Sequence, residues 1–252
     1  MRDEVRRAKL RLLRMHWEAG VGHIGGNLSC LDILICLHRR MTPSDLFVLS
    51  KGHAAGALYV ALWSIGALTD EDLDTFHGEN TRLAGHPPPN GIPQILFATG
   101  SLGHGLPLAA GVALGRQIRN EPGRTFCLVS DGELNEGSTW ESLIFSAHHR
   151  LEQLTIIVDA NGLQGFGTTR EVAHLGSLVN KIGQFVPATE IDGHDLRAIE
   201  SALSSAVVGP HVIVARTRKG AGVSFMEDRM EWHYLPMTEA QYRQARDEVE
   251  RS

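Results

Sequence analysis

The chain has 252 residues, of which 42% are hydrophobic and 21% charged, as in ordinary soluble globular proteins. At this length one domain spanning residues 1–252 is the default expectation. A formal net charge of −5 and a pI near 6.2 exclude the basic surface that duplex nucleic acid requires, so no nucleic acid partner is expected. The opening segment has charges at helical intervals and no unbroken apolar stretch. It therefore predicts neither a signal peptide nor a membrane span, but a cytoplasmic protein.

Helical and strand patterns alternate along most of the chain. Helices are expected over residues 2–18, from a cap at Asn27 or Ser29 to Arg40, and over 53–65, 105–118, 137–150, 173–183, 195–208 and 238–252, the last of them exposed. Buried strands are expected over residues 47–50, 125–130, 154–160, 188–193 and 211–217. This alternation predicts an α/β fold in which helices flank a parallel sheet. Ligand sites of such sheets lie at the carboxyl ends of the strands.

Two further features constrain the fold and the compartment. Residues 81–105 contain four prolines and many glycines, so we expect a long ordered loop, and long loops in compact domains often carry function. The three cysteines, Cys30, Cys36 and Cys127, lie in apolar runs without the CxxC spacing of a zinc site. We interpret them as reduced core residues of a cytoplasmic protein.

Polar residues follow two of the predicted strands at matching positions. Asp131 and Gly132 come directly after the strand at 125–130, and Asn161 follows the strand at 154–160. If these strands are neighbours, a carboxylate and an amide oxygen converge at one edge of the sheet. Such oxygens are ligands for Mg²⁺, which commonly completes its shell with phosphates of a substrate or cofactor.

This pattern resembles the metal-anchoring signature of the thiamine diphosphate enzymes, which is GDG followed about thirty residues later by an asparagine after an apolar strand. The resemblance implies that Asp131, Asn161 and the backbone carbonyl of Leu163 are the metal ligands. Ser130 replaces the first glycine of the signature, which could weaken cofactor affinity because glycine permits close backbone approach. Taken alone, the motif is also compatible with an acidic turn and an Asn-Gly turn in a generic α/β sheet.

Four further blocks occur in the order and spacing of the N-terminal half of transketolases. They are GVGHIGGNLSCLDIL, LSKGHAAGALYVALW, AGHPPP and ATGSLGHGL, and KGAGVSFMEDRMEWH near the end extends the resemblance over residues 1–235. The chain is most similar in layout to transketolases divided into two polypeptides. The resemblance implies that residues 1–252 form one thiamine diphosphate-binding domain.

Four histidines lie within these blocks. The resemblance places His23, His53, His86 and His233 around the cofactor diphosphate and the channel for the donor sugar, with His53 on the cofactor and the other three on the donor. Imidazoles suit both tasks, because they donate hydrogen bonds to oxygens and exchange protons near neutral pH. For any single histidine, a hydrogen-bonded structural role is the alternative. His233 departs from the family pattern, since Tyr234 follows it where the family usually has glycine.

The glycine-rich loop TGSLGHG is predicted to pass beneath the diphosphate, where main-chain amides allow close contact. Besides His53 and Asn161, the residues implied to contact the cofactor are Gly100, Ser101, Leu102, Gly103, Gly132 and Glu133. His104 stands where the family more often has glutamine, and we interpret it as a loop-surface residue that could alternatively touch substrate. Glu136 opens the next helix; the resemblance implies a catalytic role in a carboxylate network between two active sites, and a helix-capping role is the alternative.

The resemblance implies transfer of a two-carbon ketol (glycolaldehyde) unit from a ketose donor to an acceptor through thiamine diphosphate and Mg²⁺, with Ca²⁺ or Mn²⁺ able to substitute. The domain that supplies the cofactor-activating glutamate is absent from this sequence. We therefore expect a separate C-terminal transketolase-like subunit, carrying the pyrimidine-binding domain, that completes each site in an α₂β₂ assembly. The expected substrates are small sugars, and no membrane partner is expected.

Other functions remain open at this point. The metal motif also occurs in the alpha subunits of 2-oxo acid dehydrogenases and in two-chain systems that hand a two-carbon unit to a carrier protein. 1-Deoxyxylulose-5-phosphate synthases share much of the N-terminal pattern. A noncatalytic scaffold is the alternative from a different class, although both metal ligands and all four histidines are present in this sequence.

Overall fold

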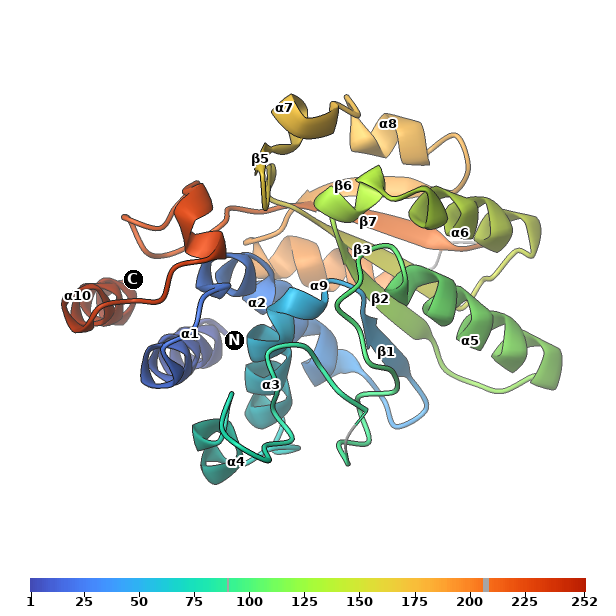
Figure 1. Cartoon of the computed structure of the whole chain (residues 1–252). Coiled ribbons are helices and arrows are strands. Elements are labelled where there is room, and N and C mark those ends of the chain that lie inside the picture. The colour runs from blue at the N-terminus through green and yellow to red at the C-terminus, as the bar shows by residue number, and fades with distance from the viewer. Residues whose placement is uncertain (90, 206–208) are drawn as a thin grey trace.

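A five-stranded parallel sheet forms the centre of the molecule (Figure 1). The computed structural model describes residues 1–89, 91–205 and 209–252. The strands lie in the order β1-β2-β3-β7-β6, with bounds β1 Leu46–Leu49, β2 Thr125–Ser130, β3 Leu154–Ala160, β6 Ala188–Asp192 and β7 His211–Arg216. The predicted α/β class and parallel sheet are confirmed. The central position of β2 and β3 brings the two motif loops to the same edge.

Helices cover both faces of the sheet. On one face lie α1 (Arg2–Ala19), α2 (Ile24–Arg40), α3 (Ala55–Ser64), α9 (Leu196–Ser204) and α10 (Glu239–Arg251), and on the other α5 (Gly105–Arg119), α6 (Gly137–His148) and α8 (Leu178–Ile182). Successive residues of β2 point to opposite faces of the sheet. Phe126 and Leu128 pack in the core on the side of α2 and α3, and Cys127 and Val129 pack in the core on the side of α5 and α6. Because the sheet is covered on both faces, its inner strands are continuous apolar runs.

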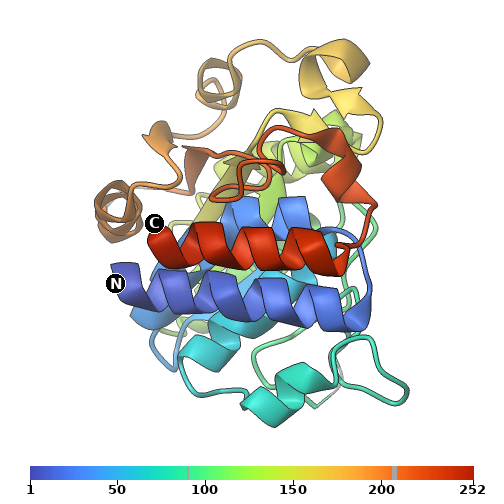
Figure 2. The same ribbon diagram turned by 90° about the vertical axis from the view of Figure 1, so that its left-hand side faces the viewer.

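The N-terminal and C-terminal helices lie side by side, as Figure 2 shows. The rings of Trp17 and Tyr242 stack with centroids 4.5 Å apart, and Ala245 and Val249 are buried in the contact. The expectation of an exposed terminal helix was therefore wrong for one face of α10. Its apolar residues are spaced about one helical turn apart, which gives a stripe too narrow to stand out in a charged segment.

The start of α2 differs from the prediction. The helix begins at Ile24, one turn before the expected caps, with His23 in a left-handed conformation (φ 64°) at its N-cap. Asn27 acts from inside the first turn, where its amide donates to the carbonyls of His23 (2.8 Å) and His53 (3.1 Å) and its oxygen accepts from the amide of Ala57 (2.6 Å). Asn27 thus joins α2 to the start of α3.

Three other segments depart from expectation. The helix expected over 173–183 is two short helices, α7 (Thr169–Ala173) and α8, separated by Gly176 in a left-handed conformation. The helix expected over 195–208 ends at Ser204, and residues 206–208 lie outside the described part of the chain. β6 is an edge strand whose residues are exposed or half-buried, so the expectation of a buried strand at 188–193 was wrong.

Several short elements were not anticipated. They are α4 (Asp70–Asp74), η2 (Gly132–Asn135), η3 (Met230–His233) and the antiparallel hairpin of β4 (Leu163–Gln164) and β5 (Gly167–Thr168). The helix expected over 53–65 consists of η1 (Gly52–Ala54) followed directly by α3. Residues 81–104, apart from the undescribed residue 90, form no helix or strand, as expected of a long loop. All three cysteines are buried and unpaired, as predicted. Among the described residues no helix is long and apolar enough to cross a membrane.

A buried histidine of α2, His38, is expected to make the stability of the fold depend on pH. His38 is 4% exposed, its Nε2 atom has no hydrogen-bond partner among the described residues, and its ring meets the edge of Phe47 at 5.0 Å. Burial lowers the pKa of His38 to about 4. In the unfolded chain this histidine is protonated below about pH 6.5, whereas in the folded chain it stays neutral down to about pH 4. The free energy of unfolding therefore falls as the pH drops below about 6.5.

Replacing His38 with leucine is expected to remove this contribution. Between pH 7 and pH 5 the free energy of unfolding of wild type should fall by about 2 kcal/mol more than that of the variant. Urea denaturation at both pH values measures the difference, and His148→Leu, at an exposed histidine of α6, is the matched control. An equal loss in wild type and His38→Leu would contradict the assignment.

Candidate active site

The loops after β2 and β3 are joined at the carboxyl edge of the sheet. Ser130 pairs with Asp159 in the parallel register, and the Asp131 amide donates to the carbonyl of Asp159 (3.1 Å). One carboxylate oxygen of Asp131 accepts from the Gly132 amide (2.9 Å) and the other from the Gly162 amide (2.6 Å). The neighbouring-strand arrangement on which the sequence prediction depended is therefore confirmed.

Asp131 is a buried carboxylate that contacts no basic side chain among the described residues. The residue is 4% exposed, and burial, reinforced by the negative charge of Asp159, raises the pKa of Asp131 to about 7. Two backbone amides offset only part of this cost. A bound cation would stabilise the ionised form directly.

Asn161 and Leu163 lie beside Asp131 in the loop after β3. The side-chain oxygen of Asn161 accepts from the Leu163 amide (3.0 Å), and its nitrogen points toward Ser29 and Asp159, at 3.4 Å from each. Leu163 opens the β4–β5 hairpin. Nowhere in residues 1–89, 91–205 and 209–252 do three His, Cys, Asp or Glu side chains gather in a metal-binding group. The oxygen atoms of this loop region include the Asp131 carboxylate, the Asn161 amide oxygen and the Leu163 backbone carbonyl.

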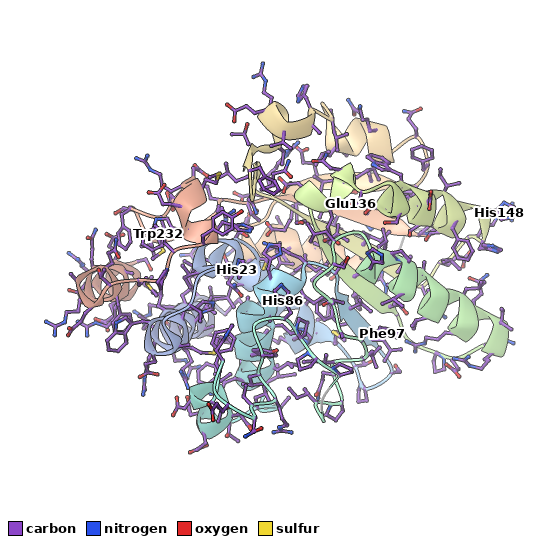
Figure 3. The ribbon with its side chains drawn as sticks, in the orientation of Figure 1. His23, His86, Phe97, Glu136, His148 and Trp232 are labelled. Atoms are coloured by element: carbon purple, nitrogen blue, oxygen red, sulfur yellow. The ribbon has the colours of Figure 1, made fainter. Side chains whose placement is uncertain are left out.

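The four predicted histidines form one cluster, although they come from separate parts of the chain. Measured from the ring centroid of His23, the rings of His233, His53 and His86 lie at 5.1, 5.6 and 6.1 Å. His53 and His233 are 5.3 Å apart. Figure 3 labels His23 and His86, whose labels lie near one another in the view, and Trp232, the residue before His233. The cluster depends on the positions of His23 at the N-cap of α2 and of His53 within η1.

Burial keeps these imidazoles neutral. It lowers the pKa of His23 to about 4 and that of His233 to about 3, and it lowers the pKa values of His53 and His86 as well. Nearby cationic groups add to the effect, with Lys219 contributing for both His23 and His233. The Nδ1 atom of His23 is buried and has no hydrogen-bond partner among the described residues. A buried orphan of this kind is typical of a ligand-binding position.

Glu133 anchors the glycine-rich loop. The residue is fully buried, and its carboxylate accepts from the Ser50 hydroxyl, the Gly103 amide (2.9 Å) and the Ser130 amide (2.9 Å). On the other side of the loop, the Ser138 hydroxyl donates to the Gly103 carbonyl (2.7 Å). The carboxylate of Glu133 is thus occupied by protein donors, which indicates that it shapes the loop rather than meeting a ligand itself.

The loop requires glycine at position 103. Gly103 has φ +78°, and a Cβ there would lie 2.6 Å from both the Glu136 Cβ and the Ser138 Oγ. Gly103→Ala is therefore expected to displace the loop and to weaken binding of the loop's ligand by roughly tenfold or more, since the strain alone is on the order of 1–3 kcal/mol. Gly111→Ala in α5 is the control, because nothing lies within 4 Å of its Cβ position.

Calorimetric titration and thermal melting of both variants check this prediction. Gly111→Ala is expected to bind normally and to stabilise the chain by about 0.5–1 kcal/mol, because alanine suits a helix interior better than glycine. Binding by Gly103→Ala at wild-type strength would show that the loop does not contact the ligand.

A buried ion pair beneath the site was not predicted from the sequence. Lys51 is 1% exposed and pairs with Asp159, which is fully buried, and its ammonium also donates to the Gly26 carbonyl (2.6 Å) and the Ser29 hydroxyl (3.1 Å). The hydroxyls of Ser29 and Thr217 donate to Asp159. This network fixes the carboxyl end of β3 to α2 and to the segment before α3. Its only sequence signal was that Lys51 lies in the LSKGHA block.

Lys219 is a second missed residue. It is 2% exposed, and its ammonium lies 3.0 Å from the Nδ1 atom of His233. Burial, with the charge of Lys51, lowers the pKa of Lys219 to about 8. A buried ammonium next to neutral imidazoles is a site for an anionic group. Its only sequence signal was its place at the start of the KGAGVSFMEDRMEWH block.

The remaining predicted residues lie at the rim. Ser101 and Glu136 are exposed, Leu102 is half-buried, and Gly100 packs against the ring of His86, where a Cβ would lie 2.9 Å from the His86 Cδ2. His104 is exposed and bonds to the Leu102 carbonyl (3.0 Å) at the start of α5. Glu136 occupies the N-cap position of α6 without a side-chain capping bond (Figure 3).

The protein is a parallel α/β domain with a polar site at the carboxyl edge of its sheet. The site contains the Asp131 carboxylate, the Asn161 amide oxygen, the buried Lys219 ammonium and the histidine cluster. The family profile described as "Transketolase, thiamine diphosphate binding domain" matches residues 8–250. The chain belongs to this transketolase family.

Relatives among characterised proteins are of two lengths. The chain is 36% identical to an apulose-4-phosphate transketolase subunit from Actinobacillus succinogenes, over 90% of this chain and 87% of that protein. It is 36% identical to a 6-deoxy-6-sulfo-D-fructose transketolase subunit from a Clostridium species, over 92% and 90%. Against transketolase-like protein 2 of Bos taurus the identity is also 36%, but the match spans only 40% of that protein.

A solved structure agrees with this assignment. The chain superposes on transketolase from Campylobacter jejuni with a TM-score of 0.89 and 26% identity, covering 99% of this chain and 42% of that one. The chain therefore corresponds in fold to one part of a longer enzyme.

Proposed function

We propose that the chain is the thiamine diphosphate-binding subunit of a two-chain transketolase that transfers a two-carbon ketol (glycolaldehyde) unit from a ketose donor to an acceptor. The observation that carries the proposal is that the four histidines cluster beside the Lys51–Asp159 pair, which in turn adjoins Asn161 and the loop of Asp131. Relatives named as transketolase subunits match this chain over nearly their whole length. Nothing in the comparisons favours a dehydrogenase-type or carrier-linked activity. Residues 1–252 would act as one cofactor-binding domain.

The residues present fit thiamine diphosphate with a divalent metal. Asp131, Asn161 and the Leu163 carbonyl would hold Mg²⁺, with Ca²⁺ or Mn²⁺ as substitutes, because all three offer hard oxygen ligands. The residues proposed to line the diphosphate are His53, Gly100, Ser101, Leu102, Gly103 and Gly132, with Glu133 acting through the loop it holds. Thiamine diphosphate, when bound, supplies the electron sink for cleavage of a carbon–carbon bond.

Lys219 is suited to the anionic end of the cofactor. A buried ammonium whose pKa is lowered to about 8 by burial gains an opposite charge when a diphosphate binds nearby. The orphaned Nδ1 atom of His23 would gain a partner when the donor binds. Binding of cofactor and donor would therefore provide an anionic partner for a buried ammonium and a hydrogen-bond partner for a buried ring nitrogen.

The histidines are proposed to recognise the donor and move its protons. Because their pKa values are lowered by burial, His23, His86 and His233 are neutral at pH 7 and can each donate one hydrogen bond and accept another. This suits hydroxyl groups, which also donate and accept. A hydroxyl proton lost during bond cleavage has an acceptor within the cluster. Glu136, exposed at the start of α6, would contribute through contacts with another subunit.

We propose that a C-terminal transketolase-like subunit carrying the pyrimidine-binding domain completes the site. Support comes from relatives named as subunits, and from the match to only 40% of a longer relative. An α₂β₂ assembly is the simplest symmetric arrangement. A cytoplasmic location belongs to the same proposal, and three unpaired cysteines are consistent with a reducing compartment.

Reconstitution tests the function. The chain is mixed with a C-terminal transketolase-like subunit from the same genome, thiamine diphosphate and Mg²⁺, and aldehyde release from a ketose donor is followed with and without an aldose acceptor. Ketol transfer that requires both chains is the expected result. No transfer with any ketose, despite cofactor binding, would contradict the proposed reaction, and absence of cofactor binding would favour a noncatalytic scaffold.

A further inference from the structure

Tyr234 joins two segments at the rim of the histidine cluster. Its hydroxyl donates to the Gly165 carbonyl at the turn of the β4–β5 hairpin (2.7 Å), and its ring meets the His233 ring edge-on at 4.7 Å. The residue is 53% exposed although its hydroxyl is held in place. One side of the ring therefore packs on the site, while the other faces outward.

The backbone around Tyr234 is held in place by the segment that precedes and begins α2. The His23 amide donates to the His233 carbonyl (3.2 Å), and Gly22 packs so closely on the Tyr234 backbone that a Cβ at position 22 would collide with the Tyr234 carbonyl. At Gly165, a Cβ would lie 2.7 Å from the Tyr234 hydroxyl oxygen. Three segments thus meet at Tyr234: the start of α2, the segment that carries His233, and the hairpin that begins at Leu163.

Glycine at position 234 would leave the space beside His233 open and would make no side-chain bond to the hairpin. Here an aromatic ring occupies that space, held by a hydrogen bond in a single orientation. The ring therefore forms a rigid wall beside His233, one of the histidines proposed to contact the donor.

We propose that Tyr234 is a positioning and specificity residue: its hydroxyl holds the β4–β5 hairpin against the His233 segment, and its ring narrows the donor entrance. The first role keeps the Leu163 carbonyl in place for the metal. The second makes the site favour short ketol donors over long ones. The inference rests on the proposed function for its second role only, because the first concerns the chain by itself.

Two substitutions separate these roles. Tyr234→Phe keeps the ring and removes the hydroxyl, whereas Tyr234→Gly removes both. Leu235→Ala is the matched control, since Leu235 is the next residue, is 50% exposed and has a side chain that cannot form a hydrogen bond. Melting temperatures show whether each variant is folded.

Amide hydrogen exchange in the isolated chain tests the first role. The reporters are the amides of Leu163 and Thr169, which donate to Asn161 Oδ1 (3.0 Å) and the Gly162 carbonyl (2.9 Å). Both Tyr234 variants are expected to exchange these amides roughly 2- to 10-fold faster, the range for loss of one hydrogen bond, and Leu235→Ala is expected to match wild type. Unchanged exchange in Tyr234→Phe would overturn the positioning role.

Donor competition in the reconstituted enzyme tests the second role. The ratio of kcat/KM for a six-carbon ketose to that for hydroxypyruvate, a three-carbon donor, is expected to rise about tenfold or more in Tyr234→Gly, the scale of a pocket-size change. The same ratio should stay near wild type in Tyr234→Phe. An unchanged ratio in Tyr234→Gly would overturn the specificity role. If wild type transfers no ketol unit, the proposed function fails instead, and hydrogen exchange still decides the positioning role.

Discussion

Asp131→Asn is expected to weaken binding of thiamine diphosphate with Mg²⁺ by at least about 100-fold, because loss of a direct charged ligand should exceed the 10- to 100-fold effect of changing its supporting partners. Asparagine preserves the shape of the side chain and removes its charge. Asp131 accepts hydrogen bonds from two backbone amides, and asparagine at this position keeps an oxygen that can still accept one of them. Titration calorimetry of the chain with its partner subunit measures the change.

A matched control tests whether the loss of cofactor affinity is specific to Asp131. Asp192 also ends a strand of the same sheet, where it accepts from the His194 amide (2.8 Å). Asp192→Asn is expected to bind the cofactor normally. Because Asp131 is buried near the negative charge of Asp159, its neutralisation is not expected to unfold the chain. If Asp131→Asn bound thiamine diphosphate and Mg²⁺ with wild-type affinity, the assignment of Asp131 as a metal ligand would be wrong.

Lys51→Met is expected to lower the free energy of unfolding by about 3–5 kcal/mol, the usual cost of leaving one member of a buried ion pair without its partner. Among the described residues, Asp159 would stay fully buried with the hydroxyls of Ser29 and Thr217 and the more distant Asn161 amide (3.4 Å) as its side-chain donors. The Gly26 carbonyl at the start of α2 would also lose the Lys51 ammonium as a donor. Urea denaturation near pH 7 measures the loss.

The double variant Lys51→Met with Asp159→Asn distinguishes the ion pair from general damage to packing. Its loss of stability is expected to fall short of the sum of the two single losses by about 0.5–3 kcal/mol. Arg216→Met, which breaks an exposed pair with Glu190 on β7 and β6, is the control and is expected to cost less than about 1 kcal/mol. Strictly additive losses would contradict a coupled pair.

The inner sheet could be predicted from the sequence because its strands are continuous apolar runs that end at turn residues. The bounds of β2 and β3 agree with the predicted 125–130 and 154–160. Predictions were weaker where tertiary contacts decide the structure. Asn27 has the chemistry of a helix cap, yet its amide is used to join α2 to α3. β6 ends at a turn signal like the inner strands, but its place at the sheet edge leaves it exposed.

The candidate site was predictable to the extent that its residues lie in recognisable blocks. The convergence of His23, His53, His86 and His233 is what the resemblance implied, and the contact of Asp131 with the loop after β3 follows from neighbouring strands. The metal-binding and catalytic roles of these residues stay predictions. The ion pair between a lysine after β1 and an aspartate of β3 could not be predicted, because its members are 108 residues apart and no sequence pattern links one to the other.

This chain is expected to form one half of a cofactor site that a second polypeptide completes. The most direct test is titration of thiamine diphosphate with Mg²⁺ into the purified chain, alone and after mixing with the C-terminal transketolase-like subunit. We expect weak binding to the chain by itself and much tighter binding to the mixture, with both lost in Asp131→Asn. No binding in either state, or equal affinity with and without the partner, would contradict the two-chain site.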